Sequence, residues 1–233
     1  MKFDLIAFDA DDTLWHNERL YRMGRERFRR LLTKYQIAEP SDGRLDEIEI
    51  RNLPYYGYGV MSFVLSLIES GIELTAGQFS SADVKALIAL GKEMLDADVQ
   101  LFEHAVEILA SLYETYPLML ITKGEPNNQL AKVARSGIAQ YFRHIEVVHD
   151  KKRDTYAAIL ERLDVAAERF LMVGNSLRSD ILPVLELGGW AVYIPHELTW
   201  AHEQIELPED CCQRMFELEN LGELPGWLES LKV

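Results

Sequence analysis

Short apolar segments alternate with helix-like segments along most of the 233-residue chain. The apolar segments have the length and content of buried strands, and the segments between them carry apolar residues at helical spacing. Strands that alternate with helices in this way form a parallel sheet with crossover helices, so the pattern predicts an α/β fold. We expect the strands near residues 4–9, 118–122, 145–148, 170–174 and 190–194.

The stretch between the first two predicted strands is helical in pattern throughout. Its helical segments, which carry apolar residues at helical spacing, are residues 16–35, 60–68 and 82–95. We therefore predict an all-helical insertion at about residues 16–94, within a core domain made of residues 1–15 and 95–233.

A tyrosine-rich segment, residues 52–59, lies within this insertion. Tyr55, Tyr56 and Tyr58 stand beside two glycines, which mark turns, so the segment reads as a loop between helices. The tyrosines can line a pocket and offer hydroxyl groups to a substrate, or pack the loop against the helical core. We favour the packing.

The composition narrows the kinds of partner that the protein binds. With 48% hydrophobic residues the chain can bury a substantial core. Lys and Arg number 24 against 38 Asp and Glu, a net charge of −14, which argues against nucleic acid and anionic membranes as partners. The N-terminus lacks the basic segment of a signal peptide, and no apolar run reaches about 18 residues, so we expect a cytoplasmic protein.

The two cysteines, Cys211 and Cys212, are adjacent in the chain. Neighbouring Cα atoms lie about 3.8 Å apart, closer than the usual separation across a disulfide. We therefore expect two reduced thiols, as in a reducing compartment.

The first predicted strand ends in a dense cluster of acidic residues, Asp9, Asp11 and Asp12, followed by Thr13. Carboxylates packed this closely repel each other unless a cation or a substrate balances them, and in open α/β sheets ligands bind at the carboxyl ends of strands. One Asp can attack phosphorus and form an aspartyl-phosphate. A carboxylate two residues further on can protonate the leaving group and later activate water. An Asp-rich turn without chemistry is the weaker alternative.

A second polar cluster, Thr122-Lys123-Gly124, follows the predicted strand that ends at Ile121. Pro126 is suited to the first position of a helix, so this cluster would lie at a helix N-terminus, where anions bind.

In sequence order these clusters resemble the motifs of the haloacid dehalogenase-like hydrolase superfamily, whose first motif is Asp-x-Asp-x-Thr after a strand. The resemblance implies a Rossmann-like parallel sheet with helices on both faces and a helical cap inserted after the first motif. It implies Asp9 as the nucleophile and Asp11 as the general acid/base, with the Asp11 carbonyl touching Mg²⁺. The Thr122 hydroxyl and the amides after it, at Lys123 and Gly124, would bind the phosphoryl group.

The third motif of this superfamily is a lone basic residue that steadies the charge of the aspartate and the phosphate. Three basic residues, Lys151, Lys152 and Arg153, follow the predicted strand at 145–148. Lys151 fits the family spacing best, five residues before Tyr156 near the head of the next helix, and Lys152 stays possible.

The fourth motif is usually Gly-Asp-x-x-x-Asp or a near variant, and here Asn175 takes the first acidic position after Gly174. Mg²⁺ often keeps several waters and needs only one or two carboxylates. The resemblance then implies Asp9 and Asp180 as charged ligands, with Asn175 as a secondary ligand. The alternative, in which Asn175 caps the next helix, stays open.

The leading functional prediction is a magnesium-dependent phosphatase that acts on a small phosphorylated metabolite through an aspartyl-phosphate. A phosphotransferase or mutase on the same fold is one alternative. A 2-haloacid dehalogenase is another, although that branch lacks the second Asp and does not need magnesium. A non-catalytic binding module is the last. The natural substrate and the oligomeric state are left open.

Overall fold

The computed structural model describes residues 3–37, 42–203, 205–206 and 213–231, so the prediction for Cys211 and Cys212 lies outside the described residues. The chain forms two compact units, Met1–Glu18 with Val99–Val233, and Arg19–Asp98. Residues 16–18 belong to the first unit because the His16 amide donates to the Gln100 carbonyl and the Asn17 and Glu18 amides donate to the Asp12 carboxylate. The division therefore falls a few residues later than the predicted limits.

One parallel sheet organises the first unit, in the strand order β3-β2-β1-β4-β5-β6. The five predicted strands are confirmed, and a short edge strand that the sequence did not reveal joins β5. The strands are β1 (Leu5–Phe8), β2 (Leu118–Lys123), β3 (His144–Val148), β4 (Phe170–Gly174), β5 (Trp190–Tyr193) and β6 (Met215–Glu217). The first motif on β1 thus lies between the second and the fourth motifs, on β2 and β4.

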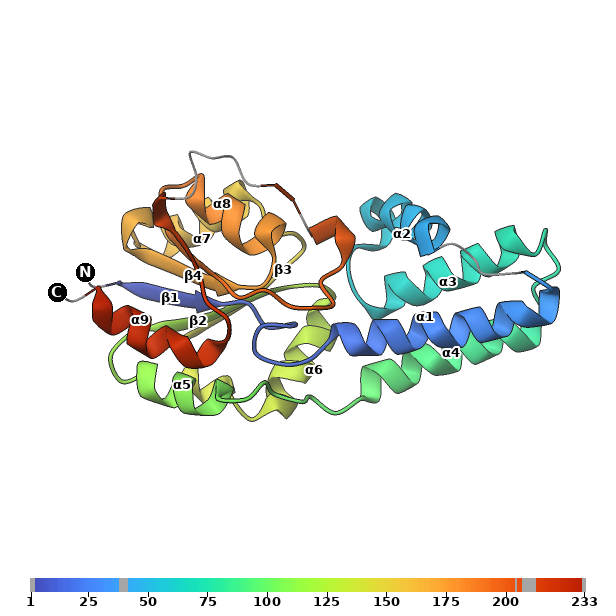
Figure 1. The fold of residues 1–233 in the computed structure, drawn as a ribbon, viewed down its shortest axis with the longest axis horizontal. Coiled ribbons are helices and arrows are strands. Elements are labelled where there is room, and N and C mark those ends of the chain that lie inside the picture. The colour runs from blue at the N-terminus through green and yellow to red at the C-terminus, as the bar shows by residue number, and fades with distance from the viewer. Residues whose placement is uncertain (1–2, 38–41, 204, 207–212, 232–233) are drawn as a thin grey trace. The chain divides into compact units, whose positions relative to one another are not determined.

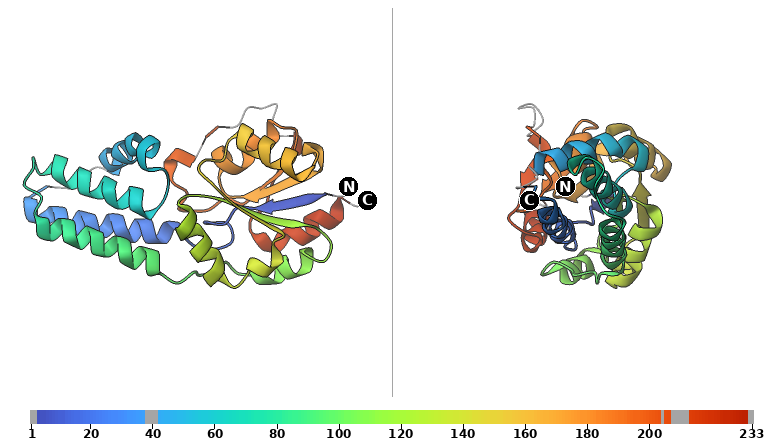
Figure 2. Two further views of the ribbon diagram at one scale, coloured as in Figure 1. Left: turned by 180° about the vertical axis from the view of Figure 1, so that it is seen from behind. Right: turned by 90° about the vertical axis from the view of Figure 1, so that its right-hand side faces the viewer.

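Helices cover both faces of this sheet (Figures 1 and 2), as predicted. One face carries α5 (Ala105–Leu112), α6 (Pro126–Ser136) and α9 (Leu224–Ser230); the other carries α7 (Arg153–Leu163) and α8 (Leu182–Leu185). The residues of β1 alternate between the two layers: Ile6 and Phe8 pack on the first face, Leu5 and Ala7 on the second. Both layers are apolar, which is why the central strands read as continuous hydrophobic runs.

The second unit is entirely helical in its described part. It holds α1 (Glu18–Leu32), which begins at the end of the first unit, α2 (Asp42–Tyr56), α3 (Val60–Leu74) and α4 (Ser81–Asp96). Its core contains Phe28, Phe63 and Leu67. None of the described helices combines the length and the apolar content that crossing a bilayer requires.

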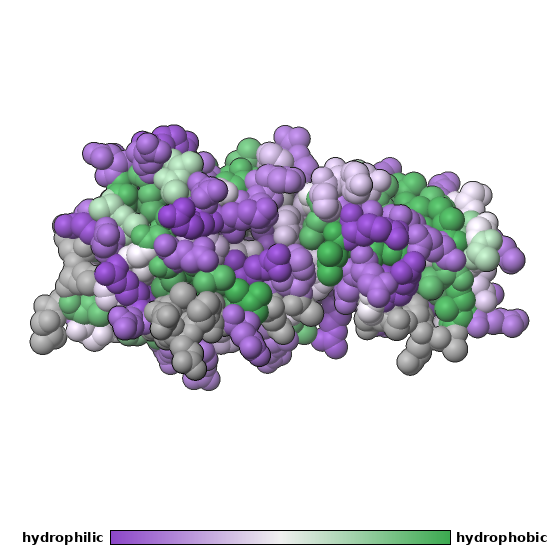
Figure 3. Space-filling view, turned by 90° about the horizontal axis from the view of Figure 1, so that it is seen from above, coloured by the Kyte–Doolittle hydropathy of each residue, from purple (hydrophilic) through white to green (hydrophobic). Residues whose placement is uncertain are grey.

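The predicted loop over residues 52–59 is confirmed only for residues 57–59, which connect α2 to α3, and was wrong for residues 52–56, because α2 continues through Pro54 to Tyr56. The helix end is fixed through Asn52, whose amide nitrogen donates to the Ser66 hydroxyl (3.1 Å) and to the Glu69 carboxylate (2.6 Å). Packing of the tyrosines was also wrong for two of them, since Tyr55 is 80% and Tyr56 52% exposed. Hydrophobic side chains lie among hydrophilic ones on the face seen in Figure 3.

Asp83 in the first turn of α4 ties together the helical unit, and its substitution tests that role. The carboxylate accepts hydrogen bonds from Lys34 Nζ (2.5 Å) and the Tyr35 hydroxyl (2.6 Å), and these bonds lower its pKa from 3.8 to about 2. The resulting stabilisation is complete above pH 3.8 and is lost as pH falls through about 2. We expect Asp83→Asn to lower the free energy of unfolding by about 1 kcal/mol at pH 7, because the exposed Lys34 is screened by water.

Urea unfolding at pH 7 and at pH 2 measures this difference. The free energy of unfolding of Asp83→Asn should lie below that of the wild type at pH 7, and the difference should shrink at pH 2. Asp96→Asn, at the exposed C-terminal end of the same helix, is the control. An equal deficit at both pH values would contradict the role of the charge.

Candidate active site

Asp9 stands directly after β1, and its buried carboxylate is held on both oxygens. Oδ1 accepts from Lys151 Nζ at 2.5 Å, and Oδ2 accepts from the Thr13 hydroxyl at 2.9 Å. The chain reverses tightly after Asp9: the amides of Leu14 and Trp15 both donate to the Ala10 carbonyl. That turn brings the Thr13 side chain back to the carboxylate four residues before it.

Of the three basic candidates, the structure brings Lys151 to Asp9. Its side chain is 1% exposed and its Nζ also contacts Asp180 Oδ1, at 2.7 Å. The side chain of Lys152 is 74% exposed and pairs with Asp150. Arg153 is the first residue of α7 and pairs with its neighbour Asp154.

The site holds more negative than positive charge around Asp9. Burial raises the pKa of Asp9, Lys151 lowers it, and Asp180 raises it again, to about 7 from 3.8. Burial lowers the pKa of Lys151, but the charges of Asp180 and Asp9 outweigh it, so the pKa of Lys151 lies above its ordinary value. A protonated Lys151 shared between two carboxylates leaves a net negative centre, which a divalent cation would balance.

Asp11 points to a different set of partners, two of which the sequence interpretation missed on α6. Its Oδ1 accepts from Lys132 Nζ and Trp15 Nε1, both at 2.6 Å, and its Oδ2 accepts from Gln129 Nε2 at 3.0 Å. Burial raises the pKa of Asp11, but the Lys132 ammonium and the other two donors lower it further, so it lies below its usual range. Gln129 and Lys132 are polar residues at the buried face of an amphipathic helix, and that pattern was the available signal.

The second motif lies at the end of β2, as predicted, but two of its predicted anion-binding groups, the Gly124 amide and the N-terminus of the next helix, are used within the chain. Thr122 is buried and its hydroxyl accepts from Gln129 Nε2 at 2.6 Å. The Gly124 amide donates to the Val148 carbonyl. The helix α6 begins at Pro126 as predicted, yet the Glu125 carboxylate caps its N-terminus by accepting from the Asn127 and Asn128 amides. The predicted free anion site at this helix end is therefore occupied by Glu125.

The fourth motif forms a tight π-helical turn, residues 177–181, directly after β4. A Cβ at Gly174 would collide with the Asp180 carboxylate, so the close approach requires glycine. The Ser176 hydroxyl accepts from the Ser179 amide (2.9 Å) and therefore caps this turn, which excludes the capping alternative for Asn175. Instead, Asn175 Oδ1 lies 3.3 Å from the Thr13 hydroxyl oxygen, which donates its proton to Asp9 at the shorter distance of 2.9 Å.

Lys123 reaches across the site to Glu203, a residue outside every motif. Lys123 Nζ pairs with Glu203 Oε1 and donates to the Ser179 hydroxyl at 2.8 Å. The Ser176 and Ser179 hydroxyls donate to Glu203 Oε2. Burial raises the pKa of Glu203, but Lys123 and the two hydroxyls lower it to about 2. No local sequence pattern marks Glu203, because its partners are distant in the chain.

The residues around Asp9 fit a cation that needs few carboxylates. Among the described residues, no group of three or more His, Cys, Asp or Glu side chains is arranged to hold a metal ion. Asp9 and Asp180 contact the same ammonium nitrogen, and the Asn175 carbonyl oxygen reaches the hydroxyl that binds Asp9. Each carboxylate oxygen of Asp9 and Asp180 accepts one hydrogen bond and keeps a further lone pair, so two carboxylates, an amide oxygen and waters suit Mg²⁺.

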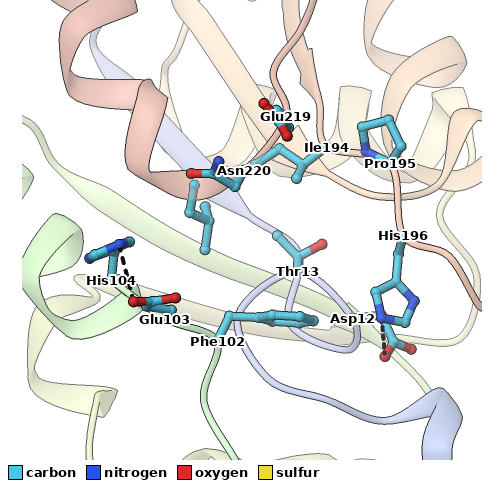
Figure 4. Close-up of a pocket in the computed structure, with 11 residues that line it drawn as sticks. Asp12, Thr13, Phe102, Glu103, His104, Ile194, Pro195, His196, Glu219 and Asn220 are labelled. Carbon is cyan, nitrogen blue, oxygen red and sulfur yellow. Dashed lines mark ion pairs between the residues drawn. The ribbon is translucent and has the colours of Figure 1, made fainter.

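A separate pocket of about 320 Å³ lies beside the first motif (Figure 4). Thr13 and Asp12 form one wall, Phe102 another, and Ile194 and His196 a third. Asp9 and Lys151 do not line it. The Asp12 carboxylate accepts hydrogen bonds from the Asn17 and Glu18 amides, so Asp12 holds the turn after β1 in place. The pocket therefore does not open onto the Asp9 carboxylate.

Comparison with known proteins identifies the chain. The family model for haloacid dehalogenase-like hydrolases matches residues 3–188. A haloacid dehalogenase-like family hydrolase from Xanthomonas campestris has a crystal structure that is 36% identical, covers 98% of this chain and 91% of that one, and superposes with a TM-score of 0.87. The chain therefore belongs to the haloacid dehalogenase-like hydrolase family.

More distant relatives share the fold. YfnB of Bacillus subtilis, a candidate HAD-hydrolase, is 26% identical over 96 residues, which are 39% of this chain and 41% of YfnB. Its magnesium-bound crystal structure covers 98% of this chain and all of its own, with a TM-score of 0.68 and 19% identity. A 2-haloacid dehalogenase from Pseudomonas syringae pv. tomato is 24% identical, with a TM-score of 0.62 and coverage of 98% and 99%.

Proposed function

We propose that this hydrolase is a magnesium-dependent phosphatase that acts on a small phosphorylated metabolite through an aspartyl-phosphate on Asp9. The observation that carries the proposal is the pair of carboxylates after β1. Asp9 is buried and fixed by Lys151 and Thr13, as a nucleophile must be, and a second carboxylate, Asp11, follows two residues later. The YfnB crystal structure bound to magnesium and the donor set around Asp9 both support the metal.

In the first step an Asp9 carboxylate oxygen bonds to phosphorus as the bond from phosphorus to the ester oxygen breaks. Asp11 in its acid form gives its proton to that oxygen, so the alcohol leaves neutral. Thr122 and Lys123 would hold the phosphoryl oxygens, and Lys151 keeps Asp9 ionised and oriented. Mg²⁺, held by Asp9, Asp180, Asn175 and the Asp11 carbonyl, would neutralise phosphoryl charge.

In the second step water attacks the phosphorus of the aspartyl-phosphate and gives a proton to the Asp11 carboxylate. The bond from phosphorus to Asp9 breaks, which releases inorganic phosphate, restores the Asp9 carboxylate and leaves Asp11 protonated for the next cycle. Lys132, Gln129 and Trp15 hold Asp11 in its carboxylate form, the form that this step requires.

A 2-haloacid dehalogenase is the second candidate, because the same three donors engage Asp11. A halide leaves without a proton, so it needs no acid, and a dehalogenase from Pseudomonas syringae shares the fold. Hydrolysis of p-nitrophenyl phosphate, with and without Mg²⁺, beside chloride release from 2-chloropropionate, separates the two. Magnesium-dependent phosphate release alone supports the phosphatase; chloride release alone would replace it.

We further propose that the helical unit Arg19–Asp98 is the cap that selects the substrate, and that the protein works in the cytoplasm. The acidic surface, with a net charge of −14, supports a small metabolite rather than nucleic acid or an anionic membrane as partner.

Asp11→Asn tests the acid/base assignment. Asn keeps the shape of the side chain but carries no proton to give, so we expect kcat to fall by about 10²–10⁴-fold. The loss should shrink for aryl phosphates with more acidic leaving groups, which need less protonation. A series of substituted phenyl phosphates measures this, and a loss that is equal for every leaving group would remove Asp11 from the acid role.

A further inference from the structure

Glu203 lies outside all four motifs, yet its carboxylate is buried among residues of two of them. It ends a short helical turn, Ala201–Glu203, in the segment after β5, and its amide donates to the Trp200 carbonyl. Its side chain is only 10% exposed. A carboxylate at this depth is costly unless it is paired, so its partners indicate what it does.

Three donors satisfy this carboxylate. Lys123 Nζ binds Oε1, and the hydroxyls of Ser176 and Ser179 donate to Oε2 at 2.5 and 2.6 Å. Lys123 Nζ also donates to the Ser179 hydroxyl at 2.8 Å, which closes a ring of hydrogen bonds. The positive charge of Lys123 and the negative charge of Glu203 are thus both compensated within the site.

The ring joins the two chain segments that flank the nucleophile. Lys123 ends β2, the serines follow β4, and these strands pair on either side of β1, which leads to Asp9. The Ser176 amide donates to Asp180 Oδ2 at 3.0 Å, so the placement of Ser176 fixes a carboxylate of the centre. The Ser179 carbonyl accepts from the Tyr156 hydroxyl on α7 at 3.1 Å.

We infer that Glu203 is a positioning residue of the hydrolytic site. It holds Lys123 at the end of β2 and the turn of residues 176–180 after β4, and through that turn it orients Asp180 beside Asp9. For its effect on catalysis the inference rests on the proposed function, in which Lys123 binds the phosphoryl group and Asp180 the metal. That Glu203 holds the turn of residues 176–180 follows from its hydrogen bonds to Ser176 and Ser179, whatever the reaction.

Glu203→Gln tests the inference, because Gln keeps the size of the side chain and one acceptor oxygen but removes the charge. Outer partners of metal-holding residues typically contribute about 10–100-fold to activity, so we expect kcat/KM for p-nitrophenyl phosphate to fall by at least about 10-fold. Hydrogen exchange at the amides of residues 175–181 should become faster. Glu197→Gln, an exposed carboxylate of the same segment, should change neither.

A double-mutant cycle with Lys123→Met shows whether Glu203 acts through Lys123. We expect the combined loss in Lys123→Met/Glu203→Gln to be smaller than the product of the two single losses, because the part of the Glu203 effect that acts through Lys123 is then gone, while the part that acts through the two serines remains. Losses that multiply would overturn this link. Should Glu203→Gln fail to fold, Ser179→Ala removes a single hydroxyl from the ring and should change activity and exchange in the same direction.

The two proposals fail in different ways. A wild-type protein that hydrolyses no phosphate ester contradicts the phosphatase proposal, and the exchange of residues 175–181 in Glu203→Gln then decides the inference. If that exchange and kcat/KM both match the wild type while the variant stays folded, the positioning role of Glu203 is wrong.

Discussion

Asp9→Asn should abolish phosphate release while leaving the fold intact. The amide is a poor nucleophile, and loss of a nucleophile typically costs about 10⁶-fold in kcat. Asn has nearly the same shape as Asp, so its oxygen still accepts the hydrogen bond from Lys151, while its amide nitrogen takes the place of Oδ2 and donates to the Thr13 hydroxyl oxygen. Burial and the charge of Asp180 already raise the pKa of Asp9 to about 7, so a neutral group here is well tolerated and stability should not fall.

Phosphate release from p-nitrophenyl phosphate measures the expected loss of activity, and thermal unfolding measures the expected retention of stability. Acid quenching during turnover, followed by mass spectrometry of peptides, should find a phosphoryl group on the wild-type peptide that holds Asp9 and none in the variant. Asp4→Asn, at the exposed start of the same segment, is the control, since Asp4 pairs with Arg169 away from the site. Turnover by Asp9→Asn within tenfold of the wild type would end the nucleophile assignment.

The centre of the sheet was predictable because β1, β2 and β4 are continuous apolar runs, buried on both faces. The same signal failed at β6, a three-residue edge strand at the margin of the sheet, and at α2. There Pro54 and two glycines favoured a loop, but hydrogen bonds from Asn52 to α3 keep the helix intact. Tertiary contacts outweighed local preference at α2, and no local pattern marks such contacts.

The residues of the candidate site also fall into those that the sequence motifs predicted and those that no motif marks. Asp9, Lys151, Asn175 and Asp180 stand at fixed places after their strands, so the order of the strands alone brings them together. Glu203 and Lys132 reach the site from segments with no motif, and only folding brings them to Lys123 and Asp11. Buried charges require partners, but the sequence does not show which residues supply them.

Lys151→Met should cost both stability and activity. Lys151 is the ammonium that Asp9 and Asp180 share, and its removal leaves two buried carboxylates side by side. Breaking a buried ion pair from one side typically costs about 3–5 kcal/mol, and we expect a loss of that size at pH 8. The pKa of Asp9, about 7 in the wild type, should rise further in the variant, since Lys151 is what lowers it.

The direction of the pH dependence follows from that shift. A carboxyl group whose pKa is raised in the folded state is harder to ionise there than in the unfolded chain. Its ionisation therefore lowers the free energy of unfolding, and this loss grows as pH rises from the unfolded pKa, 3.8, through the folded one. The deficit of Lys151→Met, measured by urea unfolding, should therefore be small near pH 4 and largest near pH 8. Lys152→Met, next in the chain and exposed, should show no such deficit, and Lys151→Met/Asp180→Asn should recover part of it because one carboxylate is neutral. A deficit that is the same at pH 4 and pH 8 would mean that Lys151 contributes packing rather than charge, and the centre around Asp9 would then need another source of balance.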